Sequence, residues 1–321
     1  MGLFDFLKPK KIKTEVSETQ IENKEIIIEI GDVILLYWIQ TNIDVKFPSY
    51  FEYDYKLNPY KHRSMLIDLG LLSYQKSSSS LQKLKVSQLK EMLQKHNMPT
   101  SGKKDTLIQR IIENFDELEN EIPESLCLTE EGQKVIDENE LLIRAHKDKF
   151  MDVAKFGTML HYNPNATYEQ LKEAIHREEI STHLKEMNFG LVRNAHHALA
   201  EMYEAMELYE KALRHYLEVI LLDCSGLGNS YNFVKRPIYE DCYINSYQVT
   251  KMRNCAEECD LDDYNKSFDQ AMKDIKSFKA KIFLTNEDFK FIRSNLLTED
   301  LIVIETYLKK YEKFNYDYYI K

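Results

Sequence analysis

Glycine and proline are scarce in this sequence. The chain has 321 residues but only 9 glycines and 7 prolines, whereas average usage would give roughly 38 of the two together in a chain of this length. β-Sandwiches, β-barrels and βαβ repeats place these residues at their many turns, so the composition argues against all three classes. We therefore expect a mainly α-helical fold.

Long apolar runs and an export leader are also missing. The most apolar stretch, residues 26–39, contains Glu29 and Asp32 and is shorter than the ~20 apolar residues that cross a bilayer. No positively charged leader precedes the first apolar residues, and Phe6 stands where a myristoylation signal has Ser or Thr. We expect no membrane span and no membrane partner.

Cysteines are few, and an odd number of them is scattered along the chain, at positions 127, 224, 242, 255 and 259. Without an export signal this distribution favours reduced thiols inside the cell. We expect a cytoplasmic protein, nucleoid-associated if its source is bacterial, or a nuclear one if its source is eukaryotic, with Lys8–Lys11 as the nuclear signal. Frequent Ile, Lys, Asn and Tyr are typical of an AT-rich genome, such as that of a low-GC bacterium or its phage.

Motifs for nucleotide, dinucleotide and zinc-hydrolase chemistry are absent: there is no GxxxxGK[ST], GxGxxG, HExxH or CxxC. Glu173-x-x-His176 is the best metal candidate, but carboxylate-bridged sites need a second such pair, which is missing. Cys255 and Cys259 have no second pair at zinc spacing and are expected to be core thiols. We expect no catalytic residue, no metal and no cofactor.

Charge is distributed unevenly. The whole chain has 43 basic and 53 acidic residues, a formal net charge of −10. Residues 81–115 nevertheless carry seven basic and three acidic residues, a net charge of +4, which leaves −14 on the remainder. One basic segment in an acidic chain indicates where a polyanion would bind.

This basic segment has the pattern of two helices joined by a tight turn. Apolar residues recur at helical spacing in 86–93 and again in 107–115. Pro99 prevents the first helix from continuing, Gly102 gives the backbone freedom where the second begins, and Ser101 is its expected N-cap. Lys103 and Lys104 then lie in the first turn, where the helix dipole disfavours cations by ~0.3–1 kcal/mol each. Their placement suits either an anion such as phosphate or simple solvation.

The same residues resemble a SAP motif, a two-helix DNA-binding module of about 35 residues that is associated with AT-rich or structurally distinctive DNA. Leu81, Leu84, Leu89 and Leu93 occupy the first helical part of the motif, and residues 98–111 the turn and the second part. Lys85 is a departure, because family members often have Thr or Ser there as a helix cap.

The resemblance implies that Lys103 and Lys104 contact phosphate, and that Arg110 makes a neighbouring contact or faces solvent. Leu89, Leu93 and other apolar positions would be structural. The residues that we expect at the DNA interface are Lys83, Lys85, Lys90, Lys95, Ser101, Gly102, Lys103, Lys104 and Arg110.

Segments on either side of the module resemble the two sides of the wing in bacterial winged-helix proteins. Residues 69–72 (Leu-Gly-Leu-Leu) read as the end of a helix and a step into a strand, and 125–128 as a strand followed by the helix cap Thr129. The resemblance implies that the module is inserted at the wing tip. Two unrelated helical pieces are the alternative.

Residues 196–223 resemble one tetratricopeptide repeat. Ala200 and Ala212 are small enough to let two antiparallel helices approach, and Tyr203 and Tyr216 would fill the space around them. No second copy follows at the ~34-residue period of such arrays. The pattern therefore predicts a helical hairpin, whether of this family or of an ordinary helical domain.

The predicted organisation is a flexible tail (1–25), a DNA-binding head (26–140) and a helical protein-interaction domain (141–321). The head consists of winged-helix-like halves at 26–76 and 121–140 with the SAP module between them, and residues 77–80, four serines, are expected to be a flexible linker. The favoured function is a non-catalytic DNA-binding adaptor or regulator, which binds DNA largely without sequence specificity, or with AT preference. Its helical domain would contact a protein partner or a second copy.

A metal-dependent nuclease or repair enzyme, delivered to DNA by the SAP module, is the alternative function. Its metal would be held by acidic clusters at 257–258 and 260–263. We rank it second because acidic runs are usually solvated faces.

Overall fold

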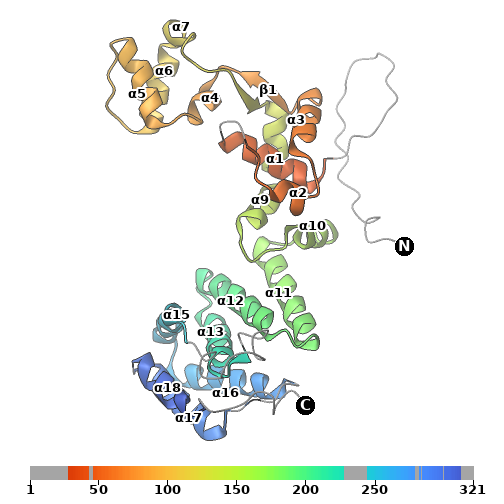
Figure 1. Cartoon of the computed structure of the whole chain (residues 1–321), viewed down its shortest axis with the longest axis vertical. Helices are drawn as coiled ribbons and strands as arrows, with labels where there is room; N and C mark the ends of the chain where they lie inside the picture. Colours follow the sequence, from red (N-terminus) through yellow and green to blue (C-terminus); the bar gives the residue numbers. More distant parts are fainter. Residues whose placement is uncertain are drawn as a thin grey trace, which may run out of the picture. The chain divides into compact units, whose positions relative to one another are not determined.

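The computed structural model describes residues 28–42, 46–227, 244–278, 282, 284–298 and 300–311 (Figure 1). The expected tail at 1–25, the basic run Lys8–Lys11 and Cys242 lie outside these residues. Helices form most of the described chain, and its strands form one two-stranded sheet. The expected mainly α class is confirmed. None of the described helices combines the length and the apolar character needed to cross a membrane.

Two compact units make up the chain, one up to Tyr162 and one from Asn163 onward. The elements of the N-terminal unit are α1 (Ile30–Thr41), α2 (Tyr50–Tyr53), α3 (Pro59–Asp68), β1 (Leu72–Gln75), α4 (Ser78–Gln82), α5 (Val86–Lys95), α6 (Lys104–Glu113), α7 (Phe115–Leu118), β2 (Ser125–Leu128), α8 (Glu130–Glu138), α9 (Glu140–Lys147) and α10 (Val153–Tyr162). Those of the C-terminal unit are α11 (Tyr168–Lys185), α12 (Phe189–Ala205), α13 (Tyr209–Cys224), α15 (Ser246–Glu257), α16 (Leu261–Ser277), α17 (Asn286–Leu296), α18 (Leu301–Leu308) and the 3-10 turn η2 (Lys309–Tyr311).

Helix α1 forms the centre of the first core. Ile34, Leu35 and Leu36 are fully buried, which explains why residues 26–39 are the most apolar stretch of the chain. Asp32 is buried among them and accepts hydrogen bonds from the backbone N–H of Glu29 (3.0 Å) and from His62 Nδ1 (2.7 Å). A buried carboxylate needs such partners, and here they join α1 to α3.

Strands β1 and β2 pair antiparallel, with Leu72 opposite Leu128 and Gln75 opposite Ser125. The predicted pairing of these two segments is confirmed, as is the N-cap of α8, since Thr129 Oγ1 accepts from the backbone N–H of Gly132 at 3.1 Å. Gly132 is required here, because a Cβ on it would lie 2.1 Å from the carbonyl oxygen of Leu71. The segment between the two strands therefore begins and ends at neighbouring positions in space, next to Gln75 and Ser125.

The predicted flexible linker at 77–80 is wrong. These serines open α4, and Ser80 is buried, with its hydroxyl donating to the carbonyl of Gln75 at 2.6 Å. Serine composition predicts flexibility, but here short hydroxyl side chains satisfy backbone groups and let α4 approach β2.

The boundary between the two units lies after Tyr162, whereas the sequence analysis placed the head's end at 140. Helix α9 packs on α1, and α10 packs on α9. Gly157 lets α10 approach Ile30, because a Cβ at this position would lie 2.5 Å from the Ile30 side chain. These contacts assign α9 and α10 to the N-terminal unit.

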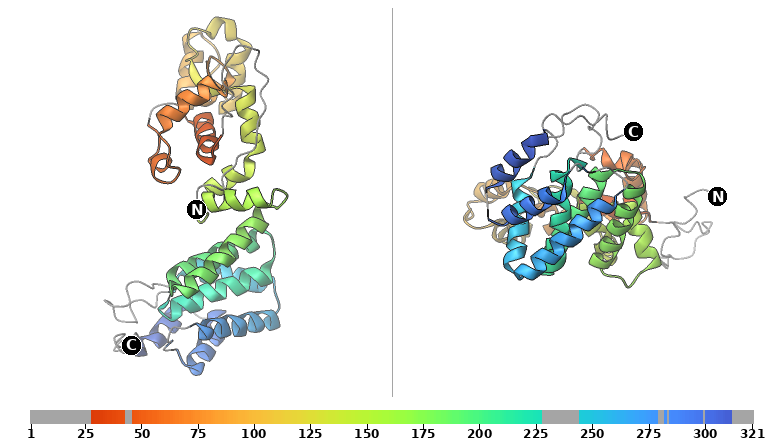
Figure 2. Two further views of the ribbon diagram at one scale, coloured as in Figure 1. Left: turned by 90° about the vertical axis from the view of Figure 1, so that its right-hand side faces the viewer. Right: turned by 90° about the horizontal axis from the view of Figure 1, so that it is seen from below.

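Helices α11, α12 and α13 lie side by side in the C-terminal unit (Figures 1 and 2). Both turns between them place a non-glycine residue in the left-handed region, Met187 (φ 56°) and Glu207 (φ 58°). In each turn the next backbone N–H donates to the carbonyl five residues earlier, at 2.8 Å and 2.9 Å, which is a Schellman-type helix end. The same type of helix end thus reverses the chain direction both between α11 and α12 and between α12 and α13.

The predicted hairpin of α12 and α13 is present. Ala200, Ala212 and Tyr216 are fully buried, and Tyr203 is 1% exposed. The small side chains allow the close approach, and the two aromatic rings fill the volume beside it. This packing does not depend on a second repeat.

Asp288, at the start of α17, binds residues from the last described segment of the chain. Its buried carboxylate accepts hydrogen bonds from Thr285 (2.8 Å), Tyr307 (2.9 Å) and Tyr311 (2.5 Å), and an ion pair from Lys310. Burial alone would raise the pKa of Asp288, but these donors outweigh it and hold the pKa below its ordinary value. Tyr311 therefore packs against its own domain; Tyr316, Tyr318 and Tyr319 lie outside the described residues.

Replacing residues 77–123 with a short Gly/Ser loop should leave the remaining head folded. The reason is that Gln75 and Ser125 face each other in the ladder, so their Cα atoms are within about 5.5 Å. Trp38, the single tryptophan, packs against Phe47 at 4.9 Å between ring centroids and reports on this core by fluorescence. Loss of its cooperative unfolding transition, while residues 77–123 still fold alone, would contradict the expectation.

Asp288→Asn should lower the free energy of unfolding of the C-terminal unit by about 2 kcal/mol at pH 7, because charge-assisted hydrogen bonds are lost. The lowered pKa means that the wild-type advantage is complete above the unfolded-state pKa and declines as the pH falls below about 4. Urea unfolding followed by circular dichroism measures both effects. Asp269→Asn is the control, since its ion pair with Arg293 is partly exposed and contributes under about 1 kcal/mol.

Candidate nucleic-acid interface

Helices α5 and α6 carry the basic segment and pack on each other around a small core. Leu89, Leu93, Leu107 and Ile111 are fully buried, as the helical spacing predicts. α4 and α7 extend this core through Leu81 and Leu118. The polar side chains of both helices therefore face outward, where they can meet a ligand.

The turn between the helices is shaped by two residues with positive φ, Asn97 (56°) and Gly102 (124°). Arg110 fixes this turn from α6, since its Nη1 donates to the carbonyls of Pro99 and Ser101. The expected Ser101 cap is wrong: Lys103 is the N-cap residue of α6, and no side chain caps that end. Gly102 turns the chain between Ser101 and the helix, which delays the helix start by two residues.

Four of the predicted cations are exposed: Lys85, Lys90, Lys95 and Lys103. The ammonium groups of Lys85, Lys90 and Lys103 make no ion pair with any residue that the structure describes. Lys85 is the N-cap of α5, and the Gln88 side chain accepts its backbone N–H at 2.9 Å. Gln88 thus makes one of the two hydrogen bonds of a capping box, and the other is the one that a Thr or Ser at position 85 would make.

The other predicted cations have partners within the module or beside it. Lys83 Nζ donates to the carbonyl of Leu126 in β2, and Lys104 Nζ donates to the carbonyl of Gln82 at the end of α4. Lys95 pairs with Glu121 at 3.2 Å. These lysines join elements of the unit, so their charge is held close to backbone oxygens or a carboxylate.

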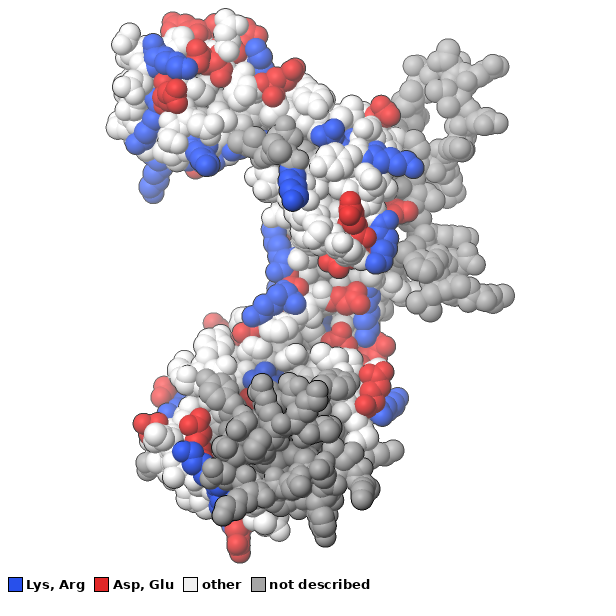
Figure 3. All heavy atoms as spheres, viewed as in Figure 1, with Lys and Arg blue, Asp and Glu red and all other residues white. Residues whose placement is uncertain are grey.

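The start of α6 leaves backbone donors open beside Ser101 and Gly102, which are both exposed. Leu107 is the first residue of α6 whose N–H reaches a helical carbonyl, that of Lys103 at 3.1 Å. The amides before it have no capping side chain, and such amides bind anions. Acidic side chains lie over α7 with some Lys and Arg beside them, and further Lys and Arg side chains lie along the opposite edge of the module (Figure 3).

Comparison with known families shows that residues 80–116 match the family model of the SAP domain. The chain therefore contains a SAP domain, which covers the end of α4, all of α5 and α6, and the start of α7. A SAP domain is a nucleic-acid-binding module, and the match agrees with the two-helix structure and the exposed cations described above. Comparison with curated proteins and with solved structures gives no significant match.

The other candidate constellations form local contacts in the C-terminal unit. His176 is buried with Nδ1 2.7 Å from Glu179, while Glu173 pairs with Arg177 at 2.8 Å. Glu173 and His176, the pair considered for a metal site, are thus each paired with a different residue. No group of three or more His, Cys, Asp or Glu among the described residues is arranged to hold a metal ion.

The acidic cluster considered for a nuclease serves to start α16. Asp260 accepts the backbone N–H of Asp263 at 2.7 Å as the N-cap, and Asp263 is 3.4 Å from Lys266. Cys255 is buried, and burial raises the pKa of its thiol to about 12; Cys259 is partly exposed.

Two functional features of the module escaped the sequence analysis. Arg110 was assigned to DNA or solvent, but it holds the turn, and Lys83 and Lys104 hold neighbouring elements. Charge counting treats all lysines alike, and only the position of the acceptor carbonyls in the folded chain distinguishes them. The sequence does contain a signal for the N-cap at Lys85, because Gln88 lies three residues after it, as in a capping box.

Proposed function

We propose that this protein is a non-catalytic DNA-binding adaptor or regulator. Its SAP module would contact the phosphate backbone through Lys85, Lys90 and Lys103, with the open amides at the start of α6 as additional donors. The observation that carries the proposal is the uncapped start of α6 next to an exposed, unpaired Lys103. A helix dipole disfavours a cation at this end, and a bound phosphate removes that penalty.

Such an interface would read little sequence. Ammonium groups and backbone amides suit phosphate oxygens, which are the same on every base step. Three of the exposed amide side chains of the module, Gln82, Gln88 and Gln109, hydrogen bond within it, which leaves fewer for the bidentate contacts that distinguish bases in the major groove. We therefore propose binding that is largely independent of sequence, or that follows the shape of AT-rich DNA.

The C-terminal unit would supply the protein contact, to a partner or to a second copy. Residues 163–321 carry 21 basic and 27 acidic residues, a net charge of −6, which repels a phosphate backbone and favours DNA binding at the basic SAP module instead. The antiparallel β1–β2 ladder and the Thr129 cap support a winged-helix-like head with the module inserted at the wing. The α12–α13 hairpin supports the tetratricopeptide-like part of the proposal.

DNA affinity should fall with salt at a log–log slope of about −2.7, which corresponds to three phosphate contacts. Lys103→Gln should weaken binding to all duplexes alike and reduce the slope by about 0.9. Lys104→Gln is the matched neighbour: its ammonium is held by the carbonyl of Gln82, so the slope should change little. Fluorescence anisotropy with labelled duplexes of different sequence, at several KCl concentrations, measures these values. Equal losses in both variants, or an unchanged slope in Lys103→Gln, would contradict the assignment.

The fragment 163–321 should be helical by circular dichroism and should fail to shift DNA in a gel at low salt, because its acidic surface repels phosphate. The fragment 1–162 should retain the DNA affinity of the full chain within about twofold. A C-terminal fragment that binds DNA as tightly as the full chain would overturn the division of labour.

A further inference from the structure

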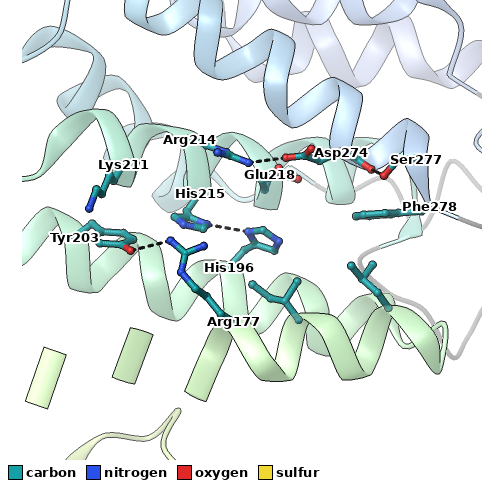
Figure 4. Close-up of a pocket in the computed structure, with 12 residues that line it drawn as sticks. Arg177, His196, Tyr203, Lys211, Arg214, His215, Glu218, Asp274, Ser277 and Phe278 are labelled. Carbon is teal, nitrogen blue, oxygen red and sulfur yellow. Dashed lines mark hydrogen bonds and ion pairs between the residues drawn. The ribbon is translucent and has the colours of Figure 1, made fainter. Parts of the chain in front are cut away.

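The C-terminal unit contains a cavity of about 410 Å³ lined by residues of α11, α12, α13 and α16 (Figure 4). This volume lies within the usual range for small-molecule sites. The cavity is separate from the SAP module, and nothing in the proposed DNA-binding function uses it. Its walls differ in chemistry, which indicates the kind of molecule that fits.

One wall consists of buried imidazole and phenol rings. His196 and His215 face each other with their Nδ1 atoms 2.9 Å apart, and Tyr203 stacks on His215 at 5.5 Å between ring centroids. Burial lowers the pKa of His196 to about 3 and that of His215 well below its ordinary value. Both rings are therefore neutral near pH 7, and with their planes tilted by 45° they form a polar wall rather than a cationic one.

Glu218 lies beside these rings with 1% exposure, and neither of its carboxyl oxygens has a hydrogen-bond partner in the described structure. Burial, followed by the neighbouring Asp274, raises the pKa of Glu218 well above its ordinary value. The carboxyl group is thus a buried polar group at the wall of the cavity, with Asp274 as its neighbour. Such a group favours a ligand that carries a hydrogen-bonding atom next to it.

Three cationic side chains line the same cavity in a unit that is otherwise acidic: Arg177, Lys211 and Arg214. Arg177 pairs with Glu173 at 2.8 Å and donates from Nη2 to the Tyr203 hydroxyl at 3.3 Å, and Arg214 pairs with Asp274 at 2.7 Å. Lys211 lies over the Tyr203 ring at 5.1 Å and has no ion pair within the described residues. Lys211 is therefore the cation of this lining that is left for phosphate oxygens, with the two paired arginines beside it.

The apolar remainder of the lining comes from Ile180 and Leu184 on α11 and from Phe278. Figure 4 shows Phe278 on one side of the cavity, away from Tyr203 and Lys211. A phosphate alone would leave this apolar part unused. We propose that the cavity binds a small phosphate-bearing ligand with a flat aromatic ring, of the mononucleotide class, with its phosphate at Lys211, beside Arg177 and Arg214.

Isothermal titration calorimetry of the full chain tests this proposal with the four ribonucleoside 5′-monophosphates, their nucleosides and inorganic phosphate as probes. At least one monophosphate should bind with 1:1 stoichiometry, and its nucleoside and inorganic phosphate should each bind at least about tenfold more weakly. Imidazole nitrogen resonances of His196 and His215 should shift on addition of that monophosphate, because the rings line the cavity.

Lys211→Gln should weaken the monophosphate at least about tenfold without changing the thermal unfolding temperature, since Lys211 is exposed. Lys266→Gln, an exposed lysine of α16 outside the cavity, is the matched control, and Lys103→Gln tests whether the ligand binds at the SAP module instead. No saturable binding of any monophosphate would overturn the proposal. Equal affinities for nucleoside and monophosphate, or a loss in Lys103→Gln rather than in Lys211→Gln, would overturn it as well.

Discussion

The pairing of β1 with β2 is the constraint on which the N-terminal unit depends. The strands have only four residues each, but the junction beside them is closed by several specific contacts. Thr129 Oγ1 lies 2.6 Å from the carbonyl of Gly70, the backbone N–H of Thr129 donates to the carbonyl of Leu71 at 3.1 Å, and Gly132 admits that same carbonyl. Helices α1 and α3 of the head contact these strands, and α4, at the start of the module, packs against β2. A short ladder therefore serves as the base from which a separately packed DNA-binding module extends.

The module itself divides its basic residues between two tasks. Lys83 and Lys104 donate to the backbone carbonyls of Leu126 and Gln82, and Arg110 holds the turn that precedes α6. Lys85, Lys90 and Lys103 are exposed and have no ion pair within the described residues. Positive charge in this two-helix module thus joins elements of the fold at some positions and remains available to a ligand at others. The net charge of the segment is the same in either case, so charge counting does not separate the two roles.

Local patterns in the sequence predicted the parts of the fold that depend on neighbouring residues. Helical spacing predicted α5 and α6, and the Leu-Thr-x-x-Gly step at 128–132 predicted both the cap of α8 and the pairing of its preceding strand. Ser77 to Ser80 were misread, because the backbone carbonyl that holds Ser80 belongs to a strand whose position composition does not reveal. The Ser101 cap failed because the positive φ of Gly102 changes where α6 begins. The cavity was beyond prediction, since its lining comes from four helices that only tertiary packing brings together.

The two units also differ in how they hold charge. In the SAP module, cations lie on a surface where salt screens them and where a long polyanion can bind without being enclosed. In the C-terminal unit, Arg177, Lys211 and Arg214 line a cavity beside His196 and His215, whose pKa values burial lowers, and Glu218, whose pKa burial raises. A cavity of about 410 Å³ is too small for a duplex, so the proposed site there would take a small ligand. The two proposed phosphate sites would therefore differ in the size of the ligand that they accept and would not compete for one ligand.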